Sequence, residues 1–325
     1  MFAYIIRRFL FMIPILVGVN LLTFALFFLV NTPDDMARVH LGQKHVTKEA
    51  IENWKHHHGY DKPLFYNKEL QAEDKITNTI FYQKSLRLFA FDFGFSDAGR
   101  DIGYDISQRM WPSLAIAIPS LIVGLLFNIS IALMMIFFRY SYLDTLGMVL
   151  CVMMMSISGL FYIIGGQYLI AKLLLLVPIS GYIPGWQIGK FLLLPVLVGI
   201  ISGIGAGVRW YRTLFLEEAS KDYVRTARAK GLKESIVLFK HILVNALIPI
   251  LTGVVALLPL LFLGSLLTES FFGIPGLGSY TIDAIGQQDF AIVRSIVFLG
   301  SFLYIVGLLM TDVSYTMVDP RVRLN

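Results

Sequence analysis

Six long apolar stretches constrain the fold of this chain more than any other feature. They cover residues 9–30, 113–138, 145–177, 191–208, 247–268 and 292–311. About 20 helical residues cross a hydrocarbon core of roughly 30 Å, and lipid offers no partner for unpaired backbone groups. The chain is 56% hydrophobic and only 15% charged, whereas soluble proteins carry about 25% charged residues. We therefore predict an all-α membrane protein with about six transmembrane helices.

The first and third stretches, residues 9–30 and 145–177, are longer than expected for a signal peptide and for one span, respectively. The first follows Arg7 and Arg8, but it is longer than the 7–15 apolar residues of a signal peptide and no small-x-small cleavage site follows it. We predict an uncleaved first span. The third is longer than one span requires, so we expect it to tilt or to break near Gly165 and Gly166.

The distribution of Lys and Arg predicts the orientation. Segment 209–246 contains eight of them, whereas segments 178–188 and 271–291 contain none. By the positive-inside rule, segment 209–246, the turn at Arg139 and both termini lie in the cytoplasm. This rule also accounts for the net charge of +5. The basic residues form no single stripe, so we predict no nucleic-acid partner.

The chain divides into four expected parts. They are an N-terminal span (1–30), an extracytoplasmic subdomain (31–111), a five-helix core (112–316) that includes the loop 209–246, and a cytoplasmic tail (317–325). Long translocated segments cross largely regardless of charge, so the basic residues in 31–111 do not conflict with this topology. Within the subdomain, Thr47 is expected to cap a short helix that ends at Gly59.

Three consecutive histidines, His56 to His58, suggest a metal site at first sight. Consecutive helical side chains point about 100° apart, so the three cannot converge on one ion. Basic residues at a helix C-terminus also complement the helix dipole. We predict no metal site. Cys151 is the only cysteine, which excludes a disulfide within the chain.

Gly199, Gly203 and Gly207 recur every four residues in the fourth stretch. Small residues at this spacing let membrane helices approach closely. Packing within one bundle is the favoured interpretation, and an interface with a second subunit or a moving gate is the alternative.

Four charged residues are considered to approach the membrane interior: Glu269, Asp312, Lys172 and Lys190. All four lie near stretch ends, where long side chains are expected to reach the interface. Because the centres of the stretches carry no ionisable residue, a secondary transporter driven by an ion gradient is disfavoured. Strings typical of hydrolases, such as H-E-x-x-H or G-x-S-x-G, are absent, so a membrane enzyme has no support.

The basic loop carries the most specific signal. Residues 222–232 read DYVRTARAKGL, which predicts a short helix closed at Gly231, with small residues where a partner surface can approach. A solvated loop that only fixes topology is the alternative. The string resembles the EAA loop (E-A-A-x-x-x-G) of membrane subunits of ABC importers, in the form found in the oligopeptide, dipeptide and nickel subgroup. Arg225 stands in place of the Glu and Thr226 in place of the first Ala.

The resemblance covers nearly the whole chain. It includes residues 4–8, 59–64, 92–94, 176–182, 269–278 and 319–323. Tyr60 stands where the family has Leu, and the stretch between Pro63 and Asp92 is longer than usual.

The resemblance implies a transport role rather than catalysis. The loop would form a coupling helix that docks on a cytoplasmic ATPase through Asp222, Tyr223, Arg225, Thr226, Ala227, Arg228 and Gly231. ATP and magnesium would bind that partner, because this chain has no G-x-x-x-x-G-K-[ST] loop. A second permease subunit and an extracytoplasmic substrate-binding protein would complete an inner-membrane importer. The expected cargo is di- or oligopeptides, and nickel is the alternative.

Overall fold

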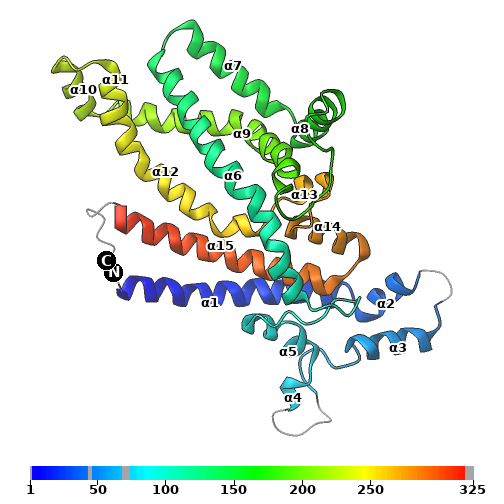
Figure 1. Cartoon of the computed structure of the whole chain (residues 1–325). Helices are drawn as coiled ribbons and strands as arrows, with labels where there is room; N and C mark the ends of the chain where they lie inside the picture. Colours follow the sequence, from blue (N-terminus) through cyan, green and yellow to red (C-terminus); the bar gives the residue numbers. More distant parts are fainter. Residues whose placement is uncertain (1, 43–45, 68–73, 319–325) are drawn as a thin grey trace. The chain divides into compact units, whose positions relative to one another are not determined.

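The computed structural model describes residues 2–42, 46–67 and 74–318. Within these ranges the chain is helical, with one isolated bridge between Phe95 and Asp101 and no strand (Figure 1). The predicted all-α fold is confirmed. The chain forms two compact units: unit 1 comprises Met1–Arg109 and Tyr280–Val306, and unit 2 comprises Met110–Ser279 and Gly307–Asn325.

In the described part of the chain, five helices are long and apolar enough to cross a membrane, and a bent helix pair provides a sixth candidate span. This agrees with the expected number. The single helices are Ile6–Val30, Ile102–Phe137, Ile188–Ala219, Glu234–Leu263 and Phe290–Ser314.

The bent pair corrects the prediction for the third stretch. It consists of α7 (Tyr142–Ser156) and α8 (Gly159–Gly166), which continues as the π-helical turn η3 (Gln167–Leu173). The two halves meet at 89°. The break lies at Ile157 and Ser158, which adopt extended backbone, and not at Gly165 and Gly166. Across the bend, the Tyr162 hydroxyl donates to the Met154 carbonyl at 2.9 Å, and the same carbonyl accepts the Ile157 N–H at 3.3 Å.

Two other boundaries in unit 2 also differ from the prediction. Helix α9 (Ile188–Ala219) continues well past residue 208, so the loop expected to start at residue 209 begins as helix. The next span starts at α11 (Glu234–Ile236), continues through η4 (Val237–Leu243) and α12 (Val244–Leu257), and ends with η5 (Pro259–Leu263). It stops before Gly264, whose φ of +68° breaks the helix. Residues 264–268 therefore belong to a separate element.

The glycines of α9 face different neighbours. A methyl group at Gly199 would press on Ser120, and one at Gly207 would collide with the Asn128 amide, both on α6 (Ile102–Phe137). Gly203 has open space beside it. Gly205, which the four-residue pattern omits, lies against the backbone of Cys151 on α7. Gly199 and Gly207 thus allow α9 to pack closely against α6, and Gly205 allows it to pack closely against α7.

Unit 1 gathers short helices around one end of the first span. The first span combines α1 (Phe2–Ala25) and η1 (Leu26–Val30), and it contacts the start of α15 (Phe290–Val318) through Phe27 and Phe290, whose rings lie 5.8 Å apart. Its core includes Phe24, Phe28 and Trp54. The short helices are α2 (Pro33–Leu41), α3 (Lys48–His58), α4 (Asp74–Thr77), α5 (Ile80–Lys84) and η2 (Leu86–Ala90).

Both predicted ends of α3 are confirmed. The Thr47 side chain accepts a hydrogen bond from the backbone N–H of Ala50 at 3.3 Å. Gly59 adopts the left-handed conformation with φ of +68°, which glycine reaches without a steric penalty.

Candidate functional site

The predicted short helix in the basic loop is present as α10 (Asp222–Ala229). Asp222 lies in its first turn, where a negative charge complements the helix dipole. Gly231 has φ of +75°, and its N–H donates to the Arg228 carbonyl at 2.9 Å. The predicted stop at Gly231 is therefore confirmed, and it depends on a conformation that favours glycine.

The inner face of α10 packs within the chain. Val224 and Ala227 are buried in a cluster that also contains Val237, Leu238 and Ile242 of η4. The Ala227 side chain is thus covered within the chain, and its part in docking stays a prediction. Its small side chain lets α10 lie close to η4. The exposed small residues of the helix are Thr226 and Ala229.

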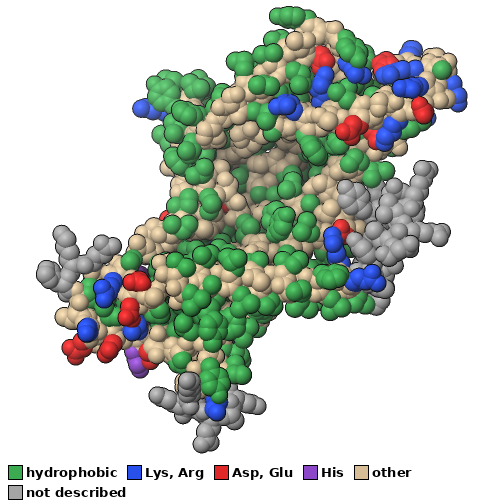
Figure 2. All heavy atoms as spheres, turned by 180° about the vertical axis from the view of Figure 1, so that it is seen from behind, with side chains coloured by type: hydrophobic (Ala, Val, Ile, Leu, Met, Phe, Trp, Pro, Cys, Tyr) green, Lys and Arg blue, Asp and Glu red, His purple; other side chains and the backbone are tan. Residues whose placement is uncertain are grey.

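The outer face of α10 is charged and accessible. The side chains of Asp222 and Arg225 are 97% and 73% exposed, and their ion pair is long at 3.5 Å. Figure 2 shows Lys and Arg side chains gathered over α10 and α11. Exposed ion pairs contribute little to stability, so the Arg225 guanidinium can exchange its contact with Asp222 for another acidic group.

Tyr223 anchors the start of α10 to the end of α9. Its hydroxyl donates a hydrogen bond to the Glu218 carboxylate, whose other oxygen accepts from Lys221 Nζ at 2.5 Å. Burial, followed by the hydrogen bond to Glu218, raises the pKa of Tyr223. Tyr223 therefore stays a neutral donor at physiological pH, and it holds the helix rather than titrating.

Arg228 joins α10 to the following helix across the turn at Gly231. Its Nε and Nη2 donate to the two oxygens of Glu234 at 3.1 and 2.6 Å. This bidentate geometry is the strongest form of a guanidinium–carboxylate contact. Hydrogen bonding to Glu234 raises the pKa of Arg228. Of the predicted docking residues, Ala227, Arg228 and Gly231 thus also stabilise the loop itself.

A buried carboxylate organises a second element of unit 2. Glu269 lies in α13 (Leu266–Phe272) and is 1% exposed. It accepts hydrogen bonds from the backbone N–H groups of Ser265 (3.1 Å), Gly278 (2.7 Å) and Ser279 (3.1 Å). Burial raises the pKa of this carboxyl group, against the effect of these hydrogen bonds. The expectation that Glu269 extends to the interface is therefore wrong, because the segment folds back over it. Lys172 and Lys190, by contrast, are exposed.

A cavity of about 360 Å³ lies beside this carboxylate in unit 2. Its walls come from α6, α9, η5 and α13. Most of its polar groups are neutral hydroxyls, contributed by Ser113, Ser120, Ser202, Ser265 and Thr268. Such a lining offers hydrogen bonds to an uncharged polar solute.

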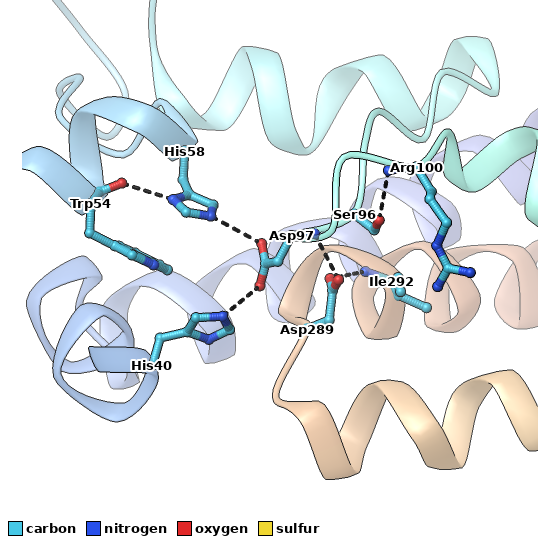
Figure 3. A network of polar contacts seen from close by, with 8 residues as sticks. All are labelled: His40, Trp54, His58, Ser96, Asp97, Arg100, Asp289 and Ile292. Atoms are coloured by element: carbon cyan, nitrogen blue, oxygen red, sulfur yellow. Dashed lines mark hydrogen bonds and ion pairs between the residues drawn. The ribbon is translucent and has the colours of Figure 1, made fainter. Parts of the chain in front are cut away.

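The three histidines lie at the end of α3 in unit 1. Nδ1 of His58 lies 2.8 Å from the Trp54 carbonyl, and its Nε2 lies 3.6 Å from Asp97 (Figure 3). His56 is 3.9 Å from Asp61. Among the residues that the structure describes, no three His, Cys, Asp or Glu side chains are grouped as metal ligands.

Comparison with known proteins adds two family matches. Residues 128–324 match the model of the binding-protein-dependent transport system inner membrane component. Residues 1–80 match the N-terminal model of the same transport systems.

Three relatives align along their whole length. The dipeptide transport system permease protein DppB of Alkalihalophilus pseudofirmus is 28% identical, over 99% of this chain and 100% of its own. A putative peptide transport system permease protein of Brucella abortus is 30% identical, over 100% of both chains. The glutathione transport system permease protein GsiC of Escherichia coli is 29% identical, over 99% of both chains. With its helical spans and these full-length matches, the chain belongs to the family of binding-protein-dependent transport system inner membrane components.

Proposed function

We propose that this protein is one permease subunit of an ABC importer that moves di- or oligopeptides across the cytoplasmic membrane. The observation that carries the proposal is the full-length similarity to permeases named for dipeptide, peptide and glutathione transport. The hydroxyl-lined cavity of unit 2 suits the peptide backbone, whose groups are polar and uncharged. No catalytic residue or cofactor is assigned to this chain.

In this proposal, α10 is the coupling helix. Its exposed face, with Asp222, Arg225 and Thr226, docks in a groove of a cytoplasmic ATPase, and the ATPase binds ATP and magnesium. Moving a two-state transporter from 1:99 to 99:1 requires about 5.5 kcal/mol of differential binding, which the nucleotide cycle of the partner supplies. By the positive-inside rule, α10 and both termini lie in the cytoplasm in this proposal. Of the basic C-terminal residues, Arg321 and Arg323 lie outside the described part of the chain.

The remaining partners follow from the same assignment. A second, homologous permease subunit pairs with this one, and cargo passes between the two. The extracytoplasmic segments, residues 31–111 and 271–291, meet the substrate-binding protein.

The ATPase partner is tested by co-purification from the native membrane. Gly231→Val places a β-branched residue at a φ of +75° and is expected to abolish recovery of a P-loop ATPase. Gly231→Asn is the matched control, because asparagine tolerates this conformation, and it should retain the partner. Arg225→Glu reverses one exposed charge without changing the fold and is expected to weaken recovery. Undiminished recovery with both Gly231→Val and Arg225→Glu would contradict the coupling role.

The cargo is tested by uptake in a deletion strain. Labelled tripeptide uptake should fall on deletion and return with the wild-type gene, whereas labelled nickel uptake should not change. Loss of nickel uptake with intact peptide uptake would assign the alternative cargo to this permease.

A further inference from the structure

Unit 1 contains a cavity of about 570 Å³ that no part of the proposed transport cycle uses. It lies among the end of α3, the segment from α5 to η2, the loop at residues 92–99 and the start of α15. Its volume falls within the range of about 300–1,000 Å³ that is typical of small-molecule pockets.

Arg294 lines this cavity and lacks hydrogen-bond partners for part of its guanidinium. The residue is 3% exposed, and its Nε and Nη1 have no acceptor among the described residues. No described carboxylate lies within 4.0 Å of it, and its guanidinium lies 5.3 Å from the Phe28 ring. Because buried donors are almost always paired, an arginine with two unpaired nitrogens at a cavity points to a ligand.

Lys84 is a second cation on the same cavity. Its ammonium lies 5.2 Å from the centre of the Tyr60 ring, and the described part of the chain offers it no carboxylate in ion-pair contact. Burial, followed by the charge of Arg294, lowers the pKa of Lys84 to about 8. The site therefore holds more positive charge than its own side chains neutralise.

The carboxylates around the cavity are already engaged. Asp92 pairs with Arg87 at 3.2 Å. Asp97 lies between His58 Nε2 (3.6 Å) and His40 Nε2 (3.9 Å). Asp289 accepts from the backbone N–H groups of Asp97 (2.8 Å) and Ile292 (3.2 Å) (Figure 3). The acids thus have partners, whereas the described residues offer no acceptor to Nε and Nη1 of Arg294 and no carboxylate in ion-pair contact with Lys84.

We propose that this cavity is a binding site for a small carboxylate, held by the guanidinium of Arg294 and the ammonium of Lys84. The planar guanidinium matches the two oxygens of a carboxylate, and Leu88 and Phe93 provide apolar wall for its carbon skeleton. The carboxylate belongs either to a free organic acid or to the C-terminus of a short peptide. The site depends neither on the peptide-import proposal nor on the ATPase, so it can be tested on the isolated chain.

Calorimetry on the purified full-length chain in lipid nanodiscs tests the proposal. The probes are glutarate, tri-alanine, the C-terminal amide of tri-alanine, and inorganic phosphate. Glutarate, tri-alanine or both should bind. The amide should bind at least about tenfold more weakly than tri-alanine, because it removes a charged acceptor. Near pH 8, binding should take up protons as Lys84 becomes fully charged, so the measured heat should vary with the ionisation enthalpy of the buffer.

Variants connect this binding to the cavity. Lys84→Met should weaken carboxylate binding about tenfold or more and abolish the proton uptake, and Lys84→Arg should retain binding. Lys75→Met is the matched control, since Lys75 lies over Tyr66 and outside the cavity, and it should bind as the wild type does. Arg294→Lys, which keeps the charge and loses the planar fork, should also bind more weakly.

The glutarate and tri-alanine probes distinguish a free organic acid from the C-terminus of a peptide. Binding of glutarate alone identifies a free organic acid, and tighter binding of tri-alanine identifies a peptide terminus. The proposal would be overturned if neither carboxylate bound, or if the amide or phosphate bound as tightly as the better of the two carboxylates. Undiminished binding by a folded Lys84→Met variant would also overturn it.

Discussion

The guanidinium of Arg212 binds both carboxylate oxygens of Asp144, with Nε–Oδ1 at 3.0 Å and Nη2–Oδ2 at 2.9 Å. The pair joins α9 to α7 within unit 2, and its side chains are only 16% and 11% exposed. Removing one partner of such a pair leaves the other charge poorly solvated, whereas removing both does not.

Arg212→Met is therefore expected to destabilise the protein by roughly 2 kcal/mol, because Asp144 loses a charged hydrogen-bond partner. The double variant Arg212→Met with Asp144→Leu should recover much of this loss. Thermal unfolding of the single and double variants in detergent checks the prediction. Additive losses in the double variant would show that the two side chains are not coupled.

Glu269→Gln should loosen the segment that folds over it. The carboxylate accepts three backbone N–H groups, and a glutamine offers only one oxygen while its NH₂ faces donors. We expect a loss of roughly 2 kcal/mol and faster proteolysis between residues 264 and 280. Ser270→Ala, a change at the exposed neighbouring position, is the control. Equal protease resistance of Glu269→Gln and wild type would argue that the carboxylate does not hold this segment.

The contact between Asp97 and His58 should make unit 1 sensitive to pH. The Trp54 carbonyl can only accept, so Nδ1 of His58 donates to it at 2.8 Å, while Nε2 lies 3.6 Å from Asp97. Burial, and then the charge of Asp289, raise the pKa of Asp97, while His58, His40 and Lys84 act in the opposite direction. The folded state thus binds more protons at this carboxyl than the unfolded state does. Its contribution to stability is present at low pH and falls as the pH rises through the raised pKa.

Asp97→Asn tests this directly. At pH 8 the new amide replaces a carboxylate whose charge burial disfavours, so we expect the variant to be at least as stable as the wild type. At pH 5.5, which is closer to the raised pKa of the Asp97 carboxyl, the wild type should gain stability relative to the variant. The melting temperatures of the variant and the wild type at pH 8 and pH 5.5 test this prediction, and Asp92→Asn is the control. A difference between variant and wild type that is unchanged by pH would refute the prediction.

Lys84 should be an unusually reactive lysine. Its pKa of about 8 gives a substantial fraction of neutral amine at pH 8, and only the neutral amine attacks acylating reagents. We expect its acetylation rate, followed by mass spectrometry, to rise with a midpoint near pH 8. A rate that is still rising steeply above pH 9 would contradict the lowered pKa.

The features of the fold that depend on local chemistry could be predicted from the sequence. Apolar runs located the spans, because lipid requires long apolar helices. Thr47, Gly59 and Gly231 located helix ends, because a capping oxygen or a left-handed residue leaves a recognisable signature. The face of α10 was harder to predict, since an alanine that packs inward looks the same in sequence as one that faces a partner.

The features that could not be predicted from the sequence depend on tertiary contacts. The bend after Ser156 carries no glycine or proline at its extended residues, and it is bridged by Tyr162 on the next helix. The sequence places Glu269 at the end of a span. Nothing nearby in the sequence indicates that the backbone N–H groups of Gly278 and Ser279 donate to its carboxylate. Arg294 sits within an apolar run, and only the folded helices of unit 1 show that it is buried beside a cavity.

The short connection between α10 and the helix that starts at Glu234 has a mechanical consequence. Val224 and Ala227 are packed against η4, and Arg228 is tied to Glu234 across the turn, so α10 cannot swing independently of the span that follows. That span is 30 residues long, or about 45 Å at 1.5 Å per residue. A displacement of α10 therefore rotates the whole span Glu234–Leu263. Because the span is long, a small rotation at Glu234 produces a larger sideways displacement at Leu263.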